Sequence, residues 1–254
     1  LLFGNFQYRM STAMAFGIGI TPNLTARSVQ GSWPYWAATD RQMAEEYFGG
    51  GFSSGFFVTG QPVPRLQYTL SVNNNISQLG VIQANDTPQL AYSVDFRWQP
   101  TTGEFGARNG LLDFEFHTTA ATQFGTSAMT SRESRYAPNA QPPNNTQIRI
   151  SDGLNVFQDS ALANGVTVQT LTYNYLSFDA GVKYRGNSIV TEYYFRRLNQ
   201  FVADGPLPLT SIYDSGFMLQ LTRMVVPKTL GVYATGGYVF DQFKRRPWEL
   251  SGGV

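Results

Sequence analysis

The sequence predicts an all-β protein, a transmembrane antiparallel β-barrel, and three observations support this fold class. Charged residues make up only 14% of the chain, whereas 42% are hydrophobic and 15% aromatic. Apolar residues recur at every second position in several segments, which is the period of a β-strand. The alternate positions hold Ser, Thr, Asn, Gln and Gly with scattered charge, and not the abundant Lys and Glu of a solvated sheet face. In such a barrel lipid contacts the apolar face, and the lumen needs only hydrogen-bonding side chains.

The strand period is clearest in residues 90–98, where Leu90, Tyr92, Val94, Phe96 and Trp98 alternate with small or polar residues. The segments with this pattern are residues 66–73, 90–98, 112–117, 178–185, 189–196 and 230–241. Aromatic residues gather near the ends of the expected strands, namely Trp98, Tyr184, Tyr238, Phe240 and Trp248. Aromatic girdles of this kind mark the two interfaces of a membrane barrel.

The expected connections alternate between short and long. Arg185-Gly186-Asn187 predicts a tight turn, whereas residues 126–165 predict a loop of about forty residues with one short strand near 147–150. A helical pattern occurs only in residues 38–48. We find no tandem repeat and no linker, so we predict that residues 1–254 form a single β-barrel domain. About ten to twelve strands can be recognised.

Several classes of function are excluded by composition. The net charge is +1, with 18 basic and 17 acidic residues, so the chain lacks the basic field that a nucleic-acid-binding protein needs. Cysteine is absent and histidine occurs once, which removes disulfides, thiolate zinc sites and covalent haem attachment. We expect no catalytic residue, no metal and no cofactor, and we predict that the protein is not an enzyme.

Four segments resemble bacterial outer-membrane porins of the phosphate-selective O/P type. They are residues 32–36 followed by 40–48, residues 73–80, residues 176–186 and residues 201–209. The resemblance extends over about residues 15–245. It implies a barrel of about sixteen strands in outer-membrane lipid, usually a homotrimer, that conducts small solutes.

Two departures from that family's pattern matter. Lysine occurs only at Lys183, Lys228 and Lys244, which is too few for phosphate selectivity to be expected. The family's amino-terminal region and last strands have no counterpart here, so we expect this chain to be an incomplete barrel.

Two groups of residues are candidates for the pore. Porins usually fold one loop inward, and the predicted constriction comprises Trp33, Tyr35, Trp36, Asp40, Arg41, Glu45 and Glu46. Its alternative is a surface loop with a helical turn capped at Thr39 or Asp40. The predicted lumen-lining residues are Asp95, Arg97, Asp113, Glu115, His117, Lys183, Arg185, Glu192 and Arg196.

These lining residues have alternative interpretations. Asp113, Glu115 and His117 share a face at two-residue spacing, which also suits a metal or acid–base site, but we favour lining. Opposite charges on neighbouring lumen positions can form a transverse field or act as stabilising cross-strand pairs. Arg196 and Arg197 must face opposite sides of a strand, which puts Arg197 near a membrane interface.

The sequence thus favours an outer-membrane porin, a passive channel for small hydrophilic solutes or ions, including small anions. Balanced charge predicts weak ion selectivity. A second hypothesis is a structural barrel that anchors or sheathes an electron-transfer or surface-layer protein. A third is a soluble extracellular β domain that binds carbohydrate through its Trp and Tyr residues.

Overall fold

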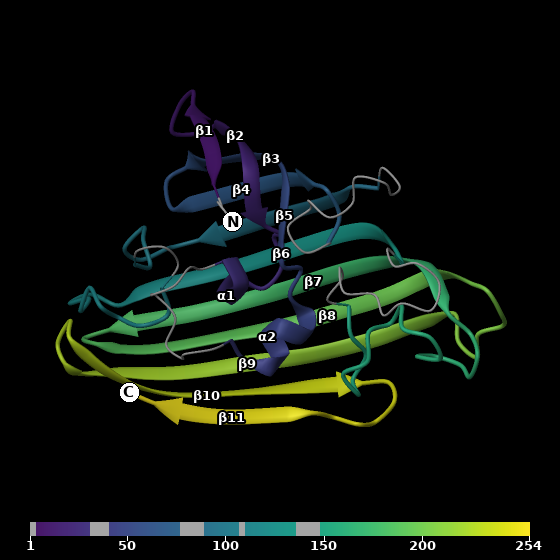
Figure 1. The fold of residues 1–254 in the computed structure, drawn as a ribbon. Helices are drawn as coiled ribbons and strands as arrows, with labels where there is room; N and C mark the ends of the chain where they lie inside the picture. The colour runs from purple at the N-terminus through teal and green to yellow at the C-terminus, as the bar shows by residue number, and fades with distance from the viewer. Residues whose placement is uncertain (1–3, 31–40, 77–88, 107–109, 136–147) are drawn as a thin grey trace.

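The structure, a computed structural model, describes residues 4–30, 41–76, 89–106, 110–135 and 148–254. These residues form one antiparallel sheet of eleven strands in which every strand pairs with its neighbours in the chain (Figure 1). The strands are β1 (Asn5–Arg9), β2 (Ala15–Pro22), β3 (Phe52–Val63), β4 (Leu66–Asn73), β5 (Ala91–Trp98), β6 (Ala121–Ser134), β7 (Val168–Tyr184), β8 (Asn187–Ala203), β9 (Ser211–Val226), β10 (Leu230–Asp241) and β11 (Trp248–Gly253). The all-β prediction is confirmed.

The sheet is open within the described residues. Strand β1 pairs with β2 alone and β11 with β10 alone, so the two edges do not meet. A closed barrel of sixteen strands is therefore not confirmed. No helix among the described residues is long and apolar enough to cross a membrane.

Two short helices, α1 (Arg27–Gln30) and α2 (Met43–Phe48), lie on one face of the sheet (Figure 1). We call this the inner face and the opposite one the outer face. Helix α2 contacts β8, β9, β10 and β11. Along β8 the alternation is strict: Glu192, Tyr194 and Arg196 are buried on the inner face, whereas Tyr193 and Phe195 are exposed on the outer face.

The hydrophobic core lies between α2 and the inner face. Phe48 is fully buried and stacks on Tyr194, with the ring centroids 5.1 Å apart. Gly216 of β9 permits this close approach, because a Cβ atom there would lie 2.6 Å from the Phe48 ring. Met218 and Val239 from the next strands are buried in the same cluster.

The predicted tight turn between residues 185 and 187 is confirmed. Arg185 and Gly186 have φ angles of 48° and 77°, and Tyr184 pairs with Asn187. Positive φ at both central residues is the pattern of a type I′ turn, whose twist matches that of the adjoining strands.

Two expectations about the chain path are wrong. Residues 112–117 form turns and not a strand, because the Asp113 carboxylate accepts a hydrogen bond from the His117 amide four residues on. Such local bonds compete with pairing in a sheet. The expected loop 126–165 begins too early, since β6 continues to Ser134.

The physical reason for the second error is the composition of β6. Its less buried positions Thr126, Ala128 and Thr130 are small or polar, so the strand has no apolar period to recognise. The short strand expected near 147–150 is an isolated bridge between Arg149 and Asn155 among the described residues.

Candidate functional site

The connection between β2 and β3 folds onto the inner face and forms the candidate site. We call its described residues, 23–30 and 41–51, the β2–β3 segment. Its two ends are held together at the sheet: the side-chain amide of Asn23 donates to the Gly50 carbonyl at 2.6 Å. Asn73 of β4 donates in turn to the Asn23 side-chain oxygen at 2.7 Å. The segment therefore enters and leaves the inner face at one point.

Glu192 of β8 caps the first helix of the segment. Its two carboxylate oxygens accept hydrogen bonds from the backbone amides of Arg27 at 2.9 Å and Ser28 at 2.8 Å. These amides have no partner inside a helix, and a carboxylate is favoured at a helix N-terminus. The predicted lining residue Glu192 is thus buried beneath α1 and holds it to the sheet.

Arg97 and Asp95 of β5 hold the other end of α1. The Arg97 Nε atom lies 2.8 Å from Asp95 Oδ1. The amide of Gln30, the last residue of α1, donates to Asp95 Oδ2 at 3.3 Å and its oxygen accepts from Arg97. Ser127 of β6 donates to the same Asp95 oxygen at 2.8 Å. Both predicted lining residues are consequently engaged by the segment.

Arg196 of β8 anchors α2. It forms an ion pair of 2.6 Å with Asp214 and donates to the carbonyl of Tyr47 at 3.0 Å. Its guanidinium carbon lies 4.0 Å from the centroid of the Tyr47 ring, and the Tyr47 hydroxyl donates to Asp214 at 3.1 Å. A further bond, to the carbonyl of Arg149 at 2.9 Å, joins the loop after β6 to this cluster.

The N-terminus of α2 is capped by two acidic side chains. Glu45 accepts a hydrogen bond from the Gln42 amide at 3.1 Å, and Glu249 of β11 accepts one from the Met43 amide at 2.7 Å. Gln42 is therefore the N-cap, whereas the expected caps Thr39 and Asp40 lie outside the described residues. Burial raises the pKa of the Glu45 carboxyl from its ordinary 4.5 to about 7.

The exposed side of α2 carries Glu46, which pairs with Arg41 at 3.5 Å. The Glu46 side chain is half exposed, whereas the preceding residue, Glu45, is buried. The two acidic residues predicted side by side in the constriction thus have different surroundings. The other predicted constriction residues, Trp33, Tyr35, Trp36 and Asp40, lie outside the described residues.

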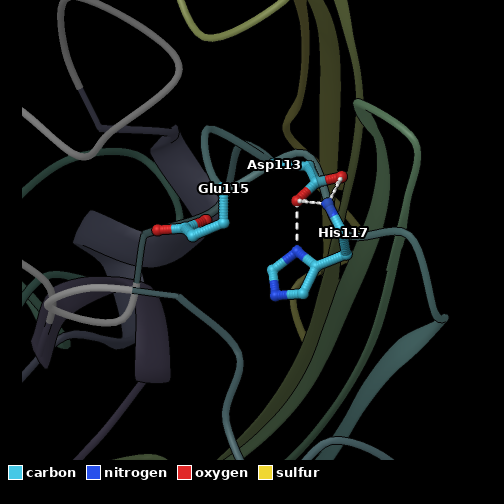
Figure 2. A group of neighbouring side chains, drawn as sticks. All are labelled: Asp113, Glu115 and His117. Atoms are coloured by element: carbon cyan, nitrogen blue, oxygen red, sulfur yellow. Dashed lines mark hydrogen bonds and ion pairs between the residues drawn. The ribbon is translucent and has the colours of Figure 1, made fainter.

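Asp113, Glu115 and His117 lie in the turns between β5 and β6 and not on a strand (Figure 2). Asp113 is fully buried and accepts hydrogen bonds from His117 and from the Gly186 amide. Glu115 is exposed. The prediction that the three share one strand face is wrong, because the chain turns at Phe116, which has a φ angle of 56°.

Lys183 and Arg185, predicted on one face of β7, have separate positions. Lys183 is fully buried and donates to the carbonyls of Phe105 and Gly110 at 2.7 and 2.8 Å. Arg185 lies in the exposed turn after β7, so it does not belong to the inner face. Lys183 thereby ties the β5–β6 connection to the sheet.

Sequence reasoning missed four residues of this site, Arg27, Glu104, Asp214 and Glu249. Asp214 has a weak signal in the sequence, since it alternates with Tyr213 and Ser215 in a strand whose apolar period is interrupted by Ser215 and Gly216. The other three lie in short or irregular segments, where a two-residue period does not identify the inward side chains.

The chain matches no family model, and comparison with curated proteins and with solved structures finds no similar one. The porin resemblance of the sequence segments stays a prediction.

Proposed function

We propose that this chain forms a passive pore in a bacterial outer membrane, with the β2–β3 segment as its constriction. One observation carries the proposal: the sheet exposes its apolar face and buries its charged face, which is the reverse of a sheet in a soluble protein. Phe178, Ile189 and Leu221 on the outer face are 51%, 49% and 44% exposed, whereas the inner face buries charged side chains. Monomeric soluble proteins rarely expose a continuous apolar patch of this extent, but a lipid-facing sheet does.

The height of the apolar band fits a membrane. On the outer face of β8 and β9, Arg223 pairs in register with Asn187 and Arg197 with Tyr213. The outward positions of β8 between them, Ile189, Thr191, Tyr193 and Phe195, are uncharged. Ten residue steps rise about 33 Å, and a strand tilt of about 40° turns this into a layer of about 25 Å, the height of the apolar band of membrane barrels.

Arg197 supports the same position of the membrane boundary. It is exposed on the outer face, whereas its neighbour Arg196 is buried on the inner face. The Arg197 guanidinium carbon lies 5.1 Å from the Tyr213 ring centroid. Arginine beside tyrosine is typical of the membrane–water interface, where a charged end reaches the headgroups.

In the proposed pore the inner-face charges hold the β2–β3 segment, and solutes pass along the side of this segment that faces away from the sheet. The half-exposed Glu46 lies on that side and pairs with the more buried Arg41, so we assign this ion pair to the lumen wall. Their opposite charges suit weak ion selectivity, with small anions and other hydrophilic solutes as cargo. The same proposal includes closure of the sheet into a barrel of about sixteen strands and assembly as a homotrimer. It also includes outer-membrane lipid as the surrounding medium.

The two alternative functions have less support. A barrel that sheathes another protein needs a free interior, but the inner-face residues Asp95, Glu192 and Arg196 are covered by the chain itself. A soluble carbohydrate-binding domain leaves the apolar outer face without a partner.

Planar-bilayer recordings of the protein extracted in detergent test the proposal. We expect stepwise conductance, and we expect Glu46→Lys to move the reversal potential in a salt gradient towards anion selectivity. The control is Lys228→Glu, a charge reversal of equal size and opposite sign in the exposed turn between β9 and β10, which should leave the reversal potential unchanged. Absence of conductance in the wild-type protein would overturn the pore.

A further inference from the structure

We propose that the outer face binds an anionic, phosphate-bearing lipid, with its headgroup at Arg197 and an acyl chain in the hollow beside this arginine. The site rests on the lipid contact of the outer face that the proposed function includes. The hollow has a volume of about 450 Å³ and crosses β7, β8, β9 and β10. Small-molecule sites have volumes of about 300–1,000 Å³. Its lining has an apolar end around Ser215 and a polar end around Arg197.

Ser215 of β9 creates the apolar end. It lies in register between Phe195 of β8 and Phe240 of β10, and each phenylalanine is 43% exposed on the outer face. Leu176 of β7 pairs in register with Phe195 and extends the same wall. A serine between two phenylalanines leaves a depression with apolar sides. Burial of a hydrocarbon chain there removes apolar surface of both partners from any contact with water.

Arg197 forms the polar end of the hollow, at the next outward position along β8 from Phe195. Its guanidinium carbon lies over the Tyr213 ring, a contact that occupies none of its N–H donors. Among the residues that the structure describes, the Arg197 guanidinium forms neither an ion pair nor a hydrogen bond. The planar fork of donors on a guanidinium matches the oxygens of a phosphate group. Arg197 is therefore available to a phosphate.

Neutral hydrogen-bond donors lie beside this arginine on both neighbouring strands. Asn174 of β7 and Tyr213 of β9 each pair in register with Arg197. The Asn174 oxygen accepts from Thr130 at 3.0 Å, and its amide nitrogen donates to Asn199 at 3.3 Å. That nitrogen carries two hydrogens, so one remains for a ligand, and the Tyr213 hydroxyl is a further donor. A headgroup at Arg197 thus meets donors from three strands.

The charge of the outer face selects an anion. Every Asp and Glu of strands β5–β11 occupies an inward position, whereas the charged residues at outward positions of these strands are Arg132, Arg197 and Arg223. Arg132 already donates to the hydroxyl of Thr172 and to a backbone carbonyl. A zwitterionic headgroup carries its own cation, which Arg197 repels, so a lipid of net negative charge is favoured.

The connections of the sheet indicate the leaflet in which this lipid lies. The connections that follow β6, β8 and β10 at the Arg197 end are residues 135–167, 204–210 and 242–247. At the opposite end, residues 185–186 and 227–229 form tight turns after β7 and β9. Membrane barrels have short turns on the periplasmic side and longer loops on the outside. The lipid at Arg197 therefore belongs to the outer leaflet of the proposed membrane.

Native mass spectrometry of the detergent-purified protein tests the site, with dioleoyl phosphatidylglycerol or dioleoyl phosphatidylcholine added. We expect the anionic phosphatidylglycerol to bind more tightly than the zwitterionic phosphatidylcholine. Arg197→Met should weaken phosphatidylglycerol binding by about tenfold or more, because hydrogen bonds to a charged group are lost. The matched control is Arg223→Met, which removes the same charge from the outer face at the opposite end of β9 and should bind this lipid as the wild-type protein does.

Ser215→Leu distinguishes a shaped site from simple attraction between charges. It retains Arg197 but fills the hollow, so we expect weaker binding of phosphatidylglycerol. Ala234→Leu adds similar bulk at an outward position of β10 and should leave binding unchanged.

Two results would overturn the lipid site: equal binding by the wild-type protein, Arg197→Met and Ser215→Leu, or equal losses in Arg197→Met and Arg223→Met. Dissociation of an oligomer in Ser215→Leu with lipid binding unchanged would also overturn it, since a second copy would then fill the hollow. A protein that conducts ions without lipid binding through Arg197 loses this site alone. One that binds the lipid through Arg197 without conducting loses the pore alone.

Discussion

Arg196 and Asp214 face each other in register across β8 and β9, and their side chains form a buried ion pair of 2.6 Å on the inner face. The same guanidinium donates to the Tyr47 carbonyl at the end of α2. One arginine thus joins two strands to the segment that covers them, so its removal affects both the sheet and the proposed constriction.

We expect Arg196→Met to lower the free energy of unfolding by about 3–5 kcal/mol, because Asp214 would be left as a buried charge without its cation. Urea unfolding in detergent measures this value. Arg197→Met, on the adjacent exposed position, should cost less than about 1 kcal/mol, which is the scale of its contact with Tyr213. Equal losses in the two variants would contradict the assigned role of Arg196.

Glu192→Gln should loosen α1 without unfolding the sheet. A hydrogen bond contributes about 0.5–1.5 kcal/mol net, and the two side-chain oxygens of Glu192 accept one each from the backbone amides of Arg27 and Ser28. The single amide oxygen of glutamine can accept only one of these two hydrogen bonds. Hydrogen exchange at these two amides should therefore accelerate by up to roughly tenfold, since 1.4 kcal/mol is a factor of ten. Unchanged exchange would mean that the cap does not stabilise α1, and Glu46→Gln provides the control.

The docking of α2 should weaken as pH rises. Burial raises the folded-state pKa of Glu45 to about 7 from its ordinary 4.5, so the folded state favours the protonated carboxyl. The stabilisation of docked α2 by the protonated Glu45 carboxyl is complete below about pH 4.5 and is lost as pH rises through about 7. The docking free energy changes by up to about 3 kcal/mol across this range. Hydrogen exchange of residues 43–48 against pH measures it. Glu45→Gln retains an acceptor for the Gln42 amide and should make the profile flat in this range.

Contact of the outer face with lipid predicts that an arginine introduced within the apolar band destabilises the protein more than an arginine introduced beyond the band. Leu219 and Val225 are both exposed on the outer face of β9, but Leu219 lies within the apolar band and Val225 beyond Arg223. Leu219→Arg should destabilise the protein in lipid vesicles by about 2–4 kcal/mol and Val225→Arg by about 0–1 kcal/mol. Equal, small effects in vesicles would mean that this face does not contact lipid.

Much of the fold follows from local sequence pattern. The strands β4, β5, β8 and β10 were recognisable because large apolar residues occupy every second position. The β7–β8 turn was recognisable because Gly186 accepts positive φ without strain. Strand β6 is recognised only in part from the sequence, because small polar residues hide its strand period. Residues 112–117 are wrongly predicted as a strand, because local hydrogen bonds replace sheet pairing there.

The sequence by itself determined the all-β class, the apolar and polar faces of the recognised strands, and the inward direction of the charges within β5 and β8, because all three depend on alternation within single segments. It did not place Glu115 and Arg185, which lie in turns. The tertiary structure alone decided what those charges contact. Glu192, Arg196 and Asp95 bind the β2–β3 segment because folding brings it across distant strands, and Glu104 meets His117 because the chain turns between them. Contacts between residues far apart in the chain depend on how the β2–β3 segment and the β5–β6 connection lie against distant strands, which no local period encodes.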